Sequence, residues 1–322
     1  MLNATLAPPQ RHDRLTIFPL LAKGAPELPF VLMADALMLG TLRITEVGSG
    51  VVGELAAVNS GGSAILVLDG EQLIGAKQNR TTNRSLLIPA KSELRIPVSC
   101  MEQGRWHDQS RPFTPSQSCS PISVRRRARD VEQAAAAAGE PASQEVLTFA
   151  QGGVWETIHH NFADLGHQSS TGALDELYTS REDDLGRASR FFTMEADQVG
   201  ILAFVGDAPI GMDIVGCRLL YEKLHERLLR GYLMDALASR RRPSKVSSPR
   251  AQKYLDRVRA ADRVAAPTIG AGRYAVLDGT VVGGELELGN DEVHLSAFPV
   301  GEPGGGGGLY TAQMSPPSRR RR

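Results

Sequence analysis

Two short polar strings carry most of the side chains with which this chain could do chemistry. The first polar string, residues 77–83, reads Lys-Gln-Asn-Arg-Thr-Thr-Asn and lies between two apolar, strand-like runs. Solvent loops are usually rich in Gly, Pro and Ser, whereas these long side chains can hydrogen-bond phosphate, ribose or carboxylate groups. We therefore expect ligand contacts from Lys77, Gln78, Asn79, Arg80 and Asn83; the alternative is a polar hairpin loop of no consequence.

The second polar string, residues 100–106, reads Cys-Met-Glu-Gln-Gly-Arg-Trp. Glu102 could act as a general base or bind a ribose hydroxyl. Arg105 and Gln103 could bind an anionic ligand, and Trp106 could stack on a base or sugar ring unless it belongs to the core. Cys100 could be a nucleophile only if its pKa is depressed, and a free cysteine is often simply buried.

Glu71 is a third catalytic candidate, because it follows an Asp-Gly turn just before the first polar string. Residues 67–75 align with residues 203–211, and residues 276–283 give a third, shorter copy, so we expect three hairpins of one type. Glycine suits such turns because it adopts positive φ without steric cost. Convergence of hairpins on one pattern is the alternative to an ancient duplication.

Familiar cofactor and metal motifs are missing from the sequence. His159, His160 and His167 fall in or near one expected helix, but no second group of ligands has matching spacing. The glycines within residues 48–53 spell GxGxxG, yet a β-like run and not a helix follows them. We therefore expect no metal site, and the cofactor is unknown.

Charge and composition limit the classes of partner and the cellular location that we expect for this chain. Lys plus Arg equals 36 and Asp plus Glu equals 36, but residues 240–263 carry nine basic against two acidic side chains, and residues 319–322 are all Arg. We interpret both stretches as solvated linker and tail, so nucleic-acid binding is not expected. There is no apolar run of the length that a membrane span needs. The three cysteines have no disulfide-like spacing, which favours a cytoplasmic location.

The spacing of apolar runs and turn signals predicts an α+β fold. Its N-terminal half would be a sandwich-like or partly closed β-barrel, with helices packed on it. The expected single domain, residues 15–300, divides into β-rich 15–106, a loop at 108–121, helical and hairpin 122–237, a basic loop and helix 239–263, and strands 273–298. Residues 1–14 and 301–322 are expected to be disordered.

Helices are expected at five places. Ala-rich residues 123–138 end before a glycine. Their first turn is rich in Arg, against the helix dipole, so these cations are expected to face an acidic surface or ligand. Residues 169–171 could cap one of the short helices. The other four helices are expected at residues 154–165, 172–178, 215–237 and 251–263.

Several of these strings together resemble a bacterial domain family associated with ADP-ribosylglycohydrolases and rhodanese/phosphatase-superfamily proteins. The resemblance rests on residues 68–71 and 75–80, on 96–100 with 102–106, on Gln151 with Val154-Trp155, and on 170–173 and 206–213. It implies a role in pathways that use or process NAD and ADP-ribose, with possible partners among the proteins of those pathways. It supplies no catalytic residues.

Two hypotheses follow. In the first, the two polar strings converge on a nucleotide-like, anionic small molecule, and the chain binds or processes it. In the second, the same strings form an internal network, and the chain is a non-catalytic structural or interaction domain.

Overall fold

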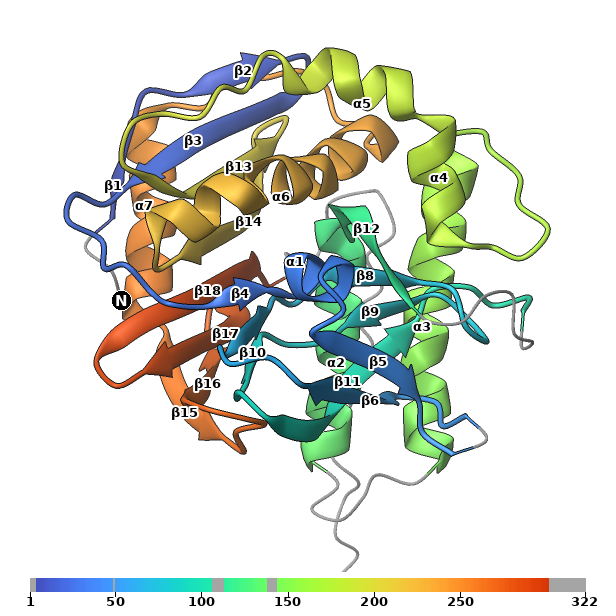
Figure 1. Ribbon diagram of the computed structural model, residues 1–322. Coiled ribbons are helices and arrows are strands. Elements are labelled where there is room, and N and C mark those ends of the chain that lie inside the picture. Colours follow the sequence, from blue (N-terminus) through green and yellow to red (C-terminus); the bar gives the residue numbers. More distant parts are fainter. Residues whose placement is uncertain (1–3, 49, 106–112, 138–143, 301–322) are drawn as a thin grey trace, which may run out of the picture.

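The computed structural model describes residues 4–48, 50–105, 113–137 and 144–300. It confirms the α+β class, with three mainly antiparallel sheets and helices packed around them (Figure 1). The first third is rich in strands, as expected. Between Leu15 and Cys100 the described residues form a single six-residue helix, α1 (Met33–Met38).

A nine-stranded antiparallel sheet unites both ends of the described chain. In sheet order its main path is β1 (Thr5–Leu6), β3 (Leu15–Leu21), β13 (Gln198–Val205), β14 (Ala208–Val215), β18 (Asp291–Pro299), β17 (Val281–Leu288), β16 (Arg273–Asp278) and β15 (Asp262–Ala266), and β2 (Gln10–His12) also pairs with β3. The last strand of the chain therefore lies in the middle of the sheet, between β14 and β17.

Both faces of this sheet are buried, because alternate strand residues point to opposite sides. Ile17 packs into one core with the apolar stripe of α6 (Arg218–Ala238), the strongest helix expected from sequence. Its neighbour Phe18 packs on the other side with Tyr254 of α7 (Ser248–Ala260). One helix thus covers each face.

Two smaller sheets form the other part of the molecule and enclose a core of their own. The six-stranded sheet has the order β12 (Thr114–Cys119), β8 (Glu71–Ile74), β9 (Arg80–Thr82), β11 (Ser92–Cys100), β6 (Glu54–Asn59) and β5 (Leu42–Glu46). The three-stranded sheet has the order β10 (Leu86–Ile88), β7 (Ile65–Val67) and β4 (Val31–Leu32). The six-stranded sheet curls in Figure 1, as a partly closed barrel does.

Two long helices, α2 (Ile122–Ala137) and α3 (Gln144–Asp164), lie side by side behind the six-stranded sheet (Figure 1). Two short helices, α4 (Leu174–Ser180) and α5 (Glu182–Ser189), lead from them to β13. The expected helices at 123–138 and 154–165 thus correspond to α2 and the second half of α3. Helix α5 has no counterpart in the sequence prediction.

Four local predictions are wrong. Within residues 1–14, β1 and β2 pair with the open edge of β3 instead of fraying. Residues 114–119, expected to be loop, form β12 because their backbone pairs with β8. Residues 67–75 are not a hairpin, because β7 and β8 belong to different sheets. Ser169 does not cap α4, whose N-cap is Ala173; its hydroxyl instead accepts the Thr171 and Gly172 amides.

The basic segment 240–263 contains the expected helix, as α7, and several of its cations pair with acidic groups of the same chain. Arg241 and Arg250 lie 3.7 and 3.5 Å from Asp207. Arg263 pairs with the buried Glu285 at 2.9 Å. The segment therefore neutralises acidic groups of this same chain. No helix in the described ranges is both long and apolar enough to cross a membrane.

Candidate functional site

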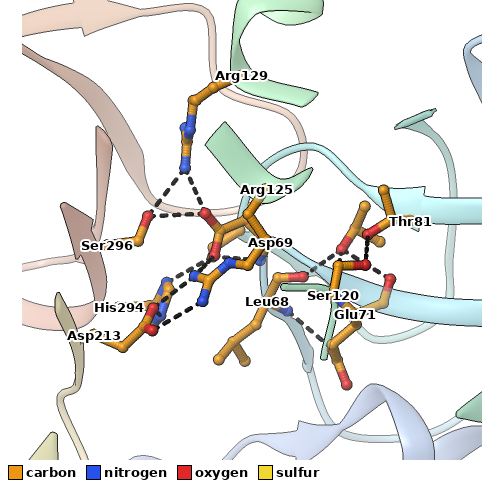
Figure 2. Close-up of polar contacts among 12 residues, drawn as sticks. Leu68, Asp69, Glu71, Thr81, Ser120, Arg125, Arg129, Asp213, His294 and Ser296 are labelled. Carbon is orange, nitrogen blue, oxygen red and sulfur yellow. Dashed lines mark hydrogen bonds and ion pairs between the residues drawn. The ribbon is translucent and has the colours of Figure 1, made fainter. Parts of the chain in front are cut away.

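A buried cluster of charged side chains lies between α2, the large sheet and the turn after β7 (Figure 2). Arg125 of α2 donates to Asp69, in the turn after β7, at 2.5 Å. It also donates to both carboxylate oxygens of Asp213 on β14, at 2.6 and 2.9 Å. All three side chains are buried. The arginines of this helix thus face acidic groups, one of the two outcomes expected from sequence.

Two further residues complete what we call the aspartate–arginine cluster: Asp69, Arg125, Arg129, Asp213 and His294. Arg129, one helical turn after Arg125, donates to Asp69 at 2.8 Å. His294 Nε2 lies 3.3 Å from Asp213 Oδ1, and its Nδ1 is 2.7 Å from the Ser85 hydroxyl. The cluster therefore ties α2 to strands of the large sheet and to the turn that leads into the six-stranded sheet.

Gly70 makes room for this arrangement. Its φ of +81° lies in the left-handed region that favours glycine. A Cβ atom built on Gly70 would lie 2.5 Å from Cδ of Arg125, well inside van der Waals contact. The sequence predicts a hairpin turn at this Asp-Gly pair. In the structure, the glycine leaves the space that the Arg125 side chain occupies.

Ion pairing keeps the two aspartates charged. Burial alone would raise the pKa of Asp213, but Arg125 and His294 outweigh it and hold the pKa of that carboxyl below its ordinary value. The pKa of Asp69 is also below its ordinary value. Burial alone would raise it, but the charges of Arg125 and Arg129 outweigh burial. Two carboxylates and two guanidinium groups therefore balance inside the molecule.

Asp69, Asp213 and His294 place three potential metal ligands within 4.8 Å of one another, which the sequence analysis did not foresee. Arg125, however, already bridges the two carboxylates, in the position that a cation would need. A divalent ion there would add charge to a buried group that is already neutral overall. The contacts fit an internal ion network better than a metal centre.

Glu71 lies beside this cluster and is fully buried (Figure 2). Its carboxylate accepts the Leu68 amide at 3.0 Å and lies 3.0 Å from a guanidinium nitrogen of Arg227. Burial raises the pKa of Glu71, against the opposing charge of Arg227. The catalytic role of Glu71 stays a prediction. In this placement, its carboxylate has no route to solvent.

The first polar string is not a solvent loop. Its last four residues form β9 and the turn after it, between β8 and β11, and only Lys77 is partly exposed. Arg80 lies against Cys100 and 3.4 Å from Glu46, and Asn83 accepts a hydrogen bond from Ser99. The long side chains of this string therefore bond mainly to other parts of the sheet.

The second polar string meets the first, as the sequence analysis expected. Gln78 donates to the Glu102 backbone carbonyl at 2.6 Å, and Arg105 donates to Asn79 at 3.2 Å. Arg105 also pairs with Glu102 at 2.6 Å, and both side chains are buried. Trp106 lies outside the described residues. The two strings thus form one network, which we call the Glu102 network: Gln78, Asn79, Glu102 and Arg105.

Cys100 is buried at the end of β11, where Gln151 of α3 bonds to its backbone amide and carbonyl. Burial raises the pKa of the Cys100 thiol to about 11, although Arg80 lies against it. A nucleophilic cysteine needs the opposite shift. We therefore assign no function to this thiol.

An open pocket of about 630 Å³ adjoins the Glu102 network. One wall is Gln103-Gly104 of the second polar string, and the opposite wall is the C-terminal half of α3 with His159 and Phe162. His167 stacks on Phe162, with ring centroids 5.6 Å apart, and the turn 168–172 completes the lining. We call this the histidine pocket. Of the predicted ligand-binding residues that the structure describes, it includes Gln103 alone.

From the sequence, His159 and His167 stand out only as candidate metal ligands. Their position near the end of a helix, just before the polar residues 168–171, is the signal that could have identified a pocket wall. The part of the lining that comes from the second polar string could not be predicted, because Gly104 and Thr171 are brought together only by the fold.

These features define an α+β protein with a buried aspartate–arginine cluster and an open pocket beside the Glu102 network. The chain belongs to the ARPP-1 family, the ARG and Rhodanese-Phosphatase-superfamily-associated Protein domain, whose model matches residues 3–298. Neither the curated proteins nor the solved structures contain a match to the chain.

Proposed function

We propose that this chain binds a nucleotide-like, anionic small molecule in the histidine pocket. The observation that carries the proposal is that a pocket of about 630 Å³ has one wall formed by the second polar string. Sites for small molecules commonly enclose roughly 300–1,000 Å³. The buried polar strings then support the site and do not themselves contact the ligand.

The lining suits a ligand with hydroxyl groups, a flat ring and negative charge. Gln103, Ser170 and Thr171 offer amide and hydroxyl groups to sugar oxygens. Phe162 and His167 offer ring faces or edges. Among the described lining residues none is Lys or Arg, so an anionic group would be bound through histidines, hydroxyls and backbone amides.

The family supports the choice of ligand class. Its name associates it with ARG and rhodanese-phosphatase proteins, which makes ADP-ribose and NAD the first ligands to test. We place the chain in the cytoplasm, alongside proteins that make or consume these molecules. The binding role is independent of whether the pocket also catalyses a reaction.

Isothermal titration with ADP-ribose, NAD, AMP and ribose 5-phosphate tests the proposal. We expect at least one to bind, and His159→Ala and His167→Ala each to weaken binding about tenfold or more, since each removes a lining side chain. His160→Ala is the matched control: His160 neighbours His159, is exposed and is not among the described lining residues. No binding by any probe at millimolar concentration would contradict the proposal, as would equal losses in all three variants.

A non-catalytic interaction domain is the second candidate. The burial and mutual bonding of Gln78, Asn79, Glu102 and Arg105 favour it, because these groups satisfy one another without a ligand. It would be supported if none of the four probes bound and affinity capture with the full chain recovered a specific partner protein.

A further inference from the structure

We infer that Glu102 is the positioning residue of the histidine pocket: its carboxylate fixes the pocket wall without touching the ligand. This inference rests on the proposed function, because it concerns the same pocket. It follows from the place of Glu102 at the junction of three segments that are distant in sequence.

Two groups donate to the Glu102 carboxylate, and the pocket turn lies close to it. Arg105, from the same loop, donates at 2.6 Å. The backbone amide of Asn79, from the first polar string, donates at 3.4 Å. Burial alone would raise the pKa of Glu102, but Arg105, the Thr171 hydroxyl of the pocket turn and the Asn79 amide together hold it below its ordinary value. The Thr171 hydroxyl itself donates to Glu176 at 3.4 Å.

The two sides of this junction are in close backbone contact. The Gly104 amide donates to the Thr171 carbonyl at 2.8 Å, and the Leu174 amide donates to the Met101 carbonyl at 3.0 Å. A Cβ atom on Gly104 would lie 2.9 Å from Cα of Thr171, so a side chain there would push the two segments apart. The Glu102 side chain spans this joint and reinforces it.

Arg105 extends the junction into the six-stranded sheet. It donates to the Ala76 carbonyl at 2.5 Å and to the Asn79 side chain at 3.2 Å. The Asn79 side chain in turn accepts the Gly75 amide at 3.0 Å. Through these bonds the pocket wall is anchored to the turn between β8 and β9.

The pocket lining begins one residue beyond these anchors. Gln103 and Gly104 lie between Glu102 and Arg105 in the chain, and Thr171, which also lines the pocket, accepts the Gly104 amide through its backbone carbonyl. A wall that is held in place before the ligand arrives loses less conformational freedom on binding. Loss of the Glu102 carboxylate should therefore loosen both sides of the wall and weaken binding.

Hydrogen–deuterium exchange and titration with ADP-ribose, at a temperature where all variants are folded, test the inference. We expect Glu102→Ala to speed exchange about tenfold or more in residues 100–105 and 168–174, and to weaken binding by a similar factor. Glu102→Gln should fall between this variant and the wild type, because its amide oxygen still accepts from Arg105. Glu54→Gln is the control, since Glu54 also pairs with an arginine but lies on the surface.

Unchanged exchange in the two segments would overturn the inference, and so would faster exchange spread evenly over the molecule, which would mean a purely structural role. Should Glu102→Ala fail to fold, Glu102→Gln decides on the same readouts. A wild-type chain that binds none of the four probes would contradict the proposed function, whereas the exchange measurement would still decide whether Glu102 positions the wall.

Discussion

The aspartate–arginine cluster and the Glu102 network are both buried ion networks, yet their surroundings differ. The first lies between sheets and helices, with every charged group buried. The second borders the histidine pocket, where Gln103 and Gly104 are exposed next to the buried Glu102 and Arg105. The contrast suggests a division of labour: the sealed network holds the parts of the fold together, and the network beside the pocket sets the shape of its wall.

The sealed network should be the more sensitive to loss of a single charge. Arg125→Met leaves Asp69 and Asp213 buried with less compensation, and the loss of one partner of a buried pair typically costs about 3–5 kcal/mol. We expect the free energy of unfolding, measured by urea denaturation, to fall by that amount. A loss below about 1 kcal/mol would show that water or another cation replaces the guanidinium.

Arg105→Met should cost less stability but also change binding. The Glu102 carboxylate that it leaves behind is close to the open pocket, so rehydration can replace part of the lost ion pair. We expect a loss of about 1–3 kcal/mol in the free energy of unfolding, together with weaker ADP-ribose binding. A loss of stability as large as that of Arg125→Met, with unchanged binding, would erase the distinction between the two networks.

Acid titration should show the smallest effect. The pKa values of Asp69 and Asp213 are lowered in the folded chain. Their contribution to stability is therefore present above the ordinary aspartate pKa of about 3.9 and is lost as the pH falls through the folded pKa values. Below about pH 5 we expect urea denaturation to show a fall of roughly 1 kcal/mol per pH unit. In Arg125→Met this slope should flatten, and an unchanged slope would assign the acid sensitivity to other groups.

Asp235 works in the opposite direction and provides a control for the titration. Burial raises the pKa of Asp235 to about 6, against hydrogen bonds from Ser123 and the Ile122 amide. Its contribution is thus fully present below about pH 4 and is lost as the pH rises through about 6. Repeating the titration in Asp235→Asn separates it from the effect of the two aspartates. Burial therefore prevails at Asp235, where the donors are mainly neutral, whereas paired arginines outweigh burial at Asp69 and Asp213.

The elements of this fold were more accessible from sequence than its site. An apolar stripe in the sequence predicts helix α6, and a run of alanines followed by a glycine predicts α2. Arg125 gave a usable signal, because cations in a first helical turn need an acidic partner. Asp213, a charge within an otherwise apolar strand, gave another, but its partner is remote in the chain.

The site was harder to predict because the sequence does not show which polar residues are buried. Residues 77–83 were expected to line a ligand site, since polar side chains usually lie at the surface. Arg80 is buried instead because Gln78, Cys100 and Glu46 surround it, and two of these three are distant in sequence. The pocket itself depends on the contact between Gly104 and Thr171, which no local pattern encodes.

The position of β18 has a consequence for how the chain is made. Because this final strand lies between β14 and β17, the nine-stranded sheet is completed from its middle. Until residues 291–299 have left the ribosome, β14 keeps a raw edge and β15 to β17 form a detached piece. A truncation before Asp291 would therefore split the sheet and expose two unpaired edges, which are templates for aggregation. It would also remove His294 and Ser296, so the aspartate–arginine cluster could be completed only after these residues had been synthesised.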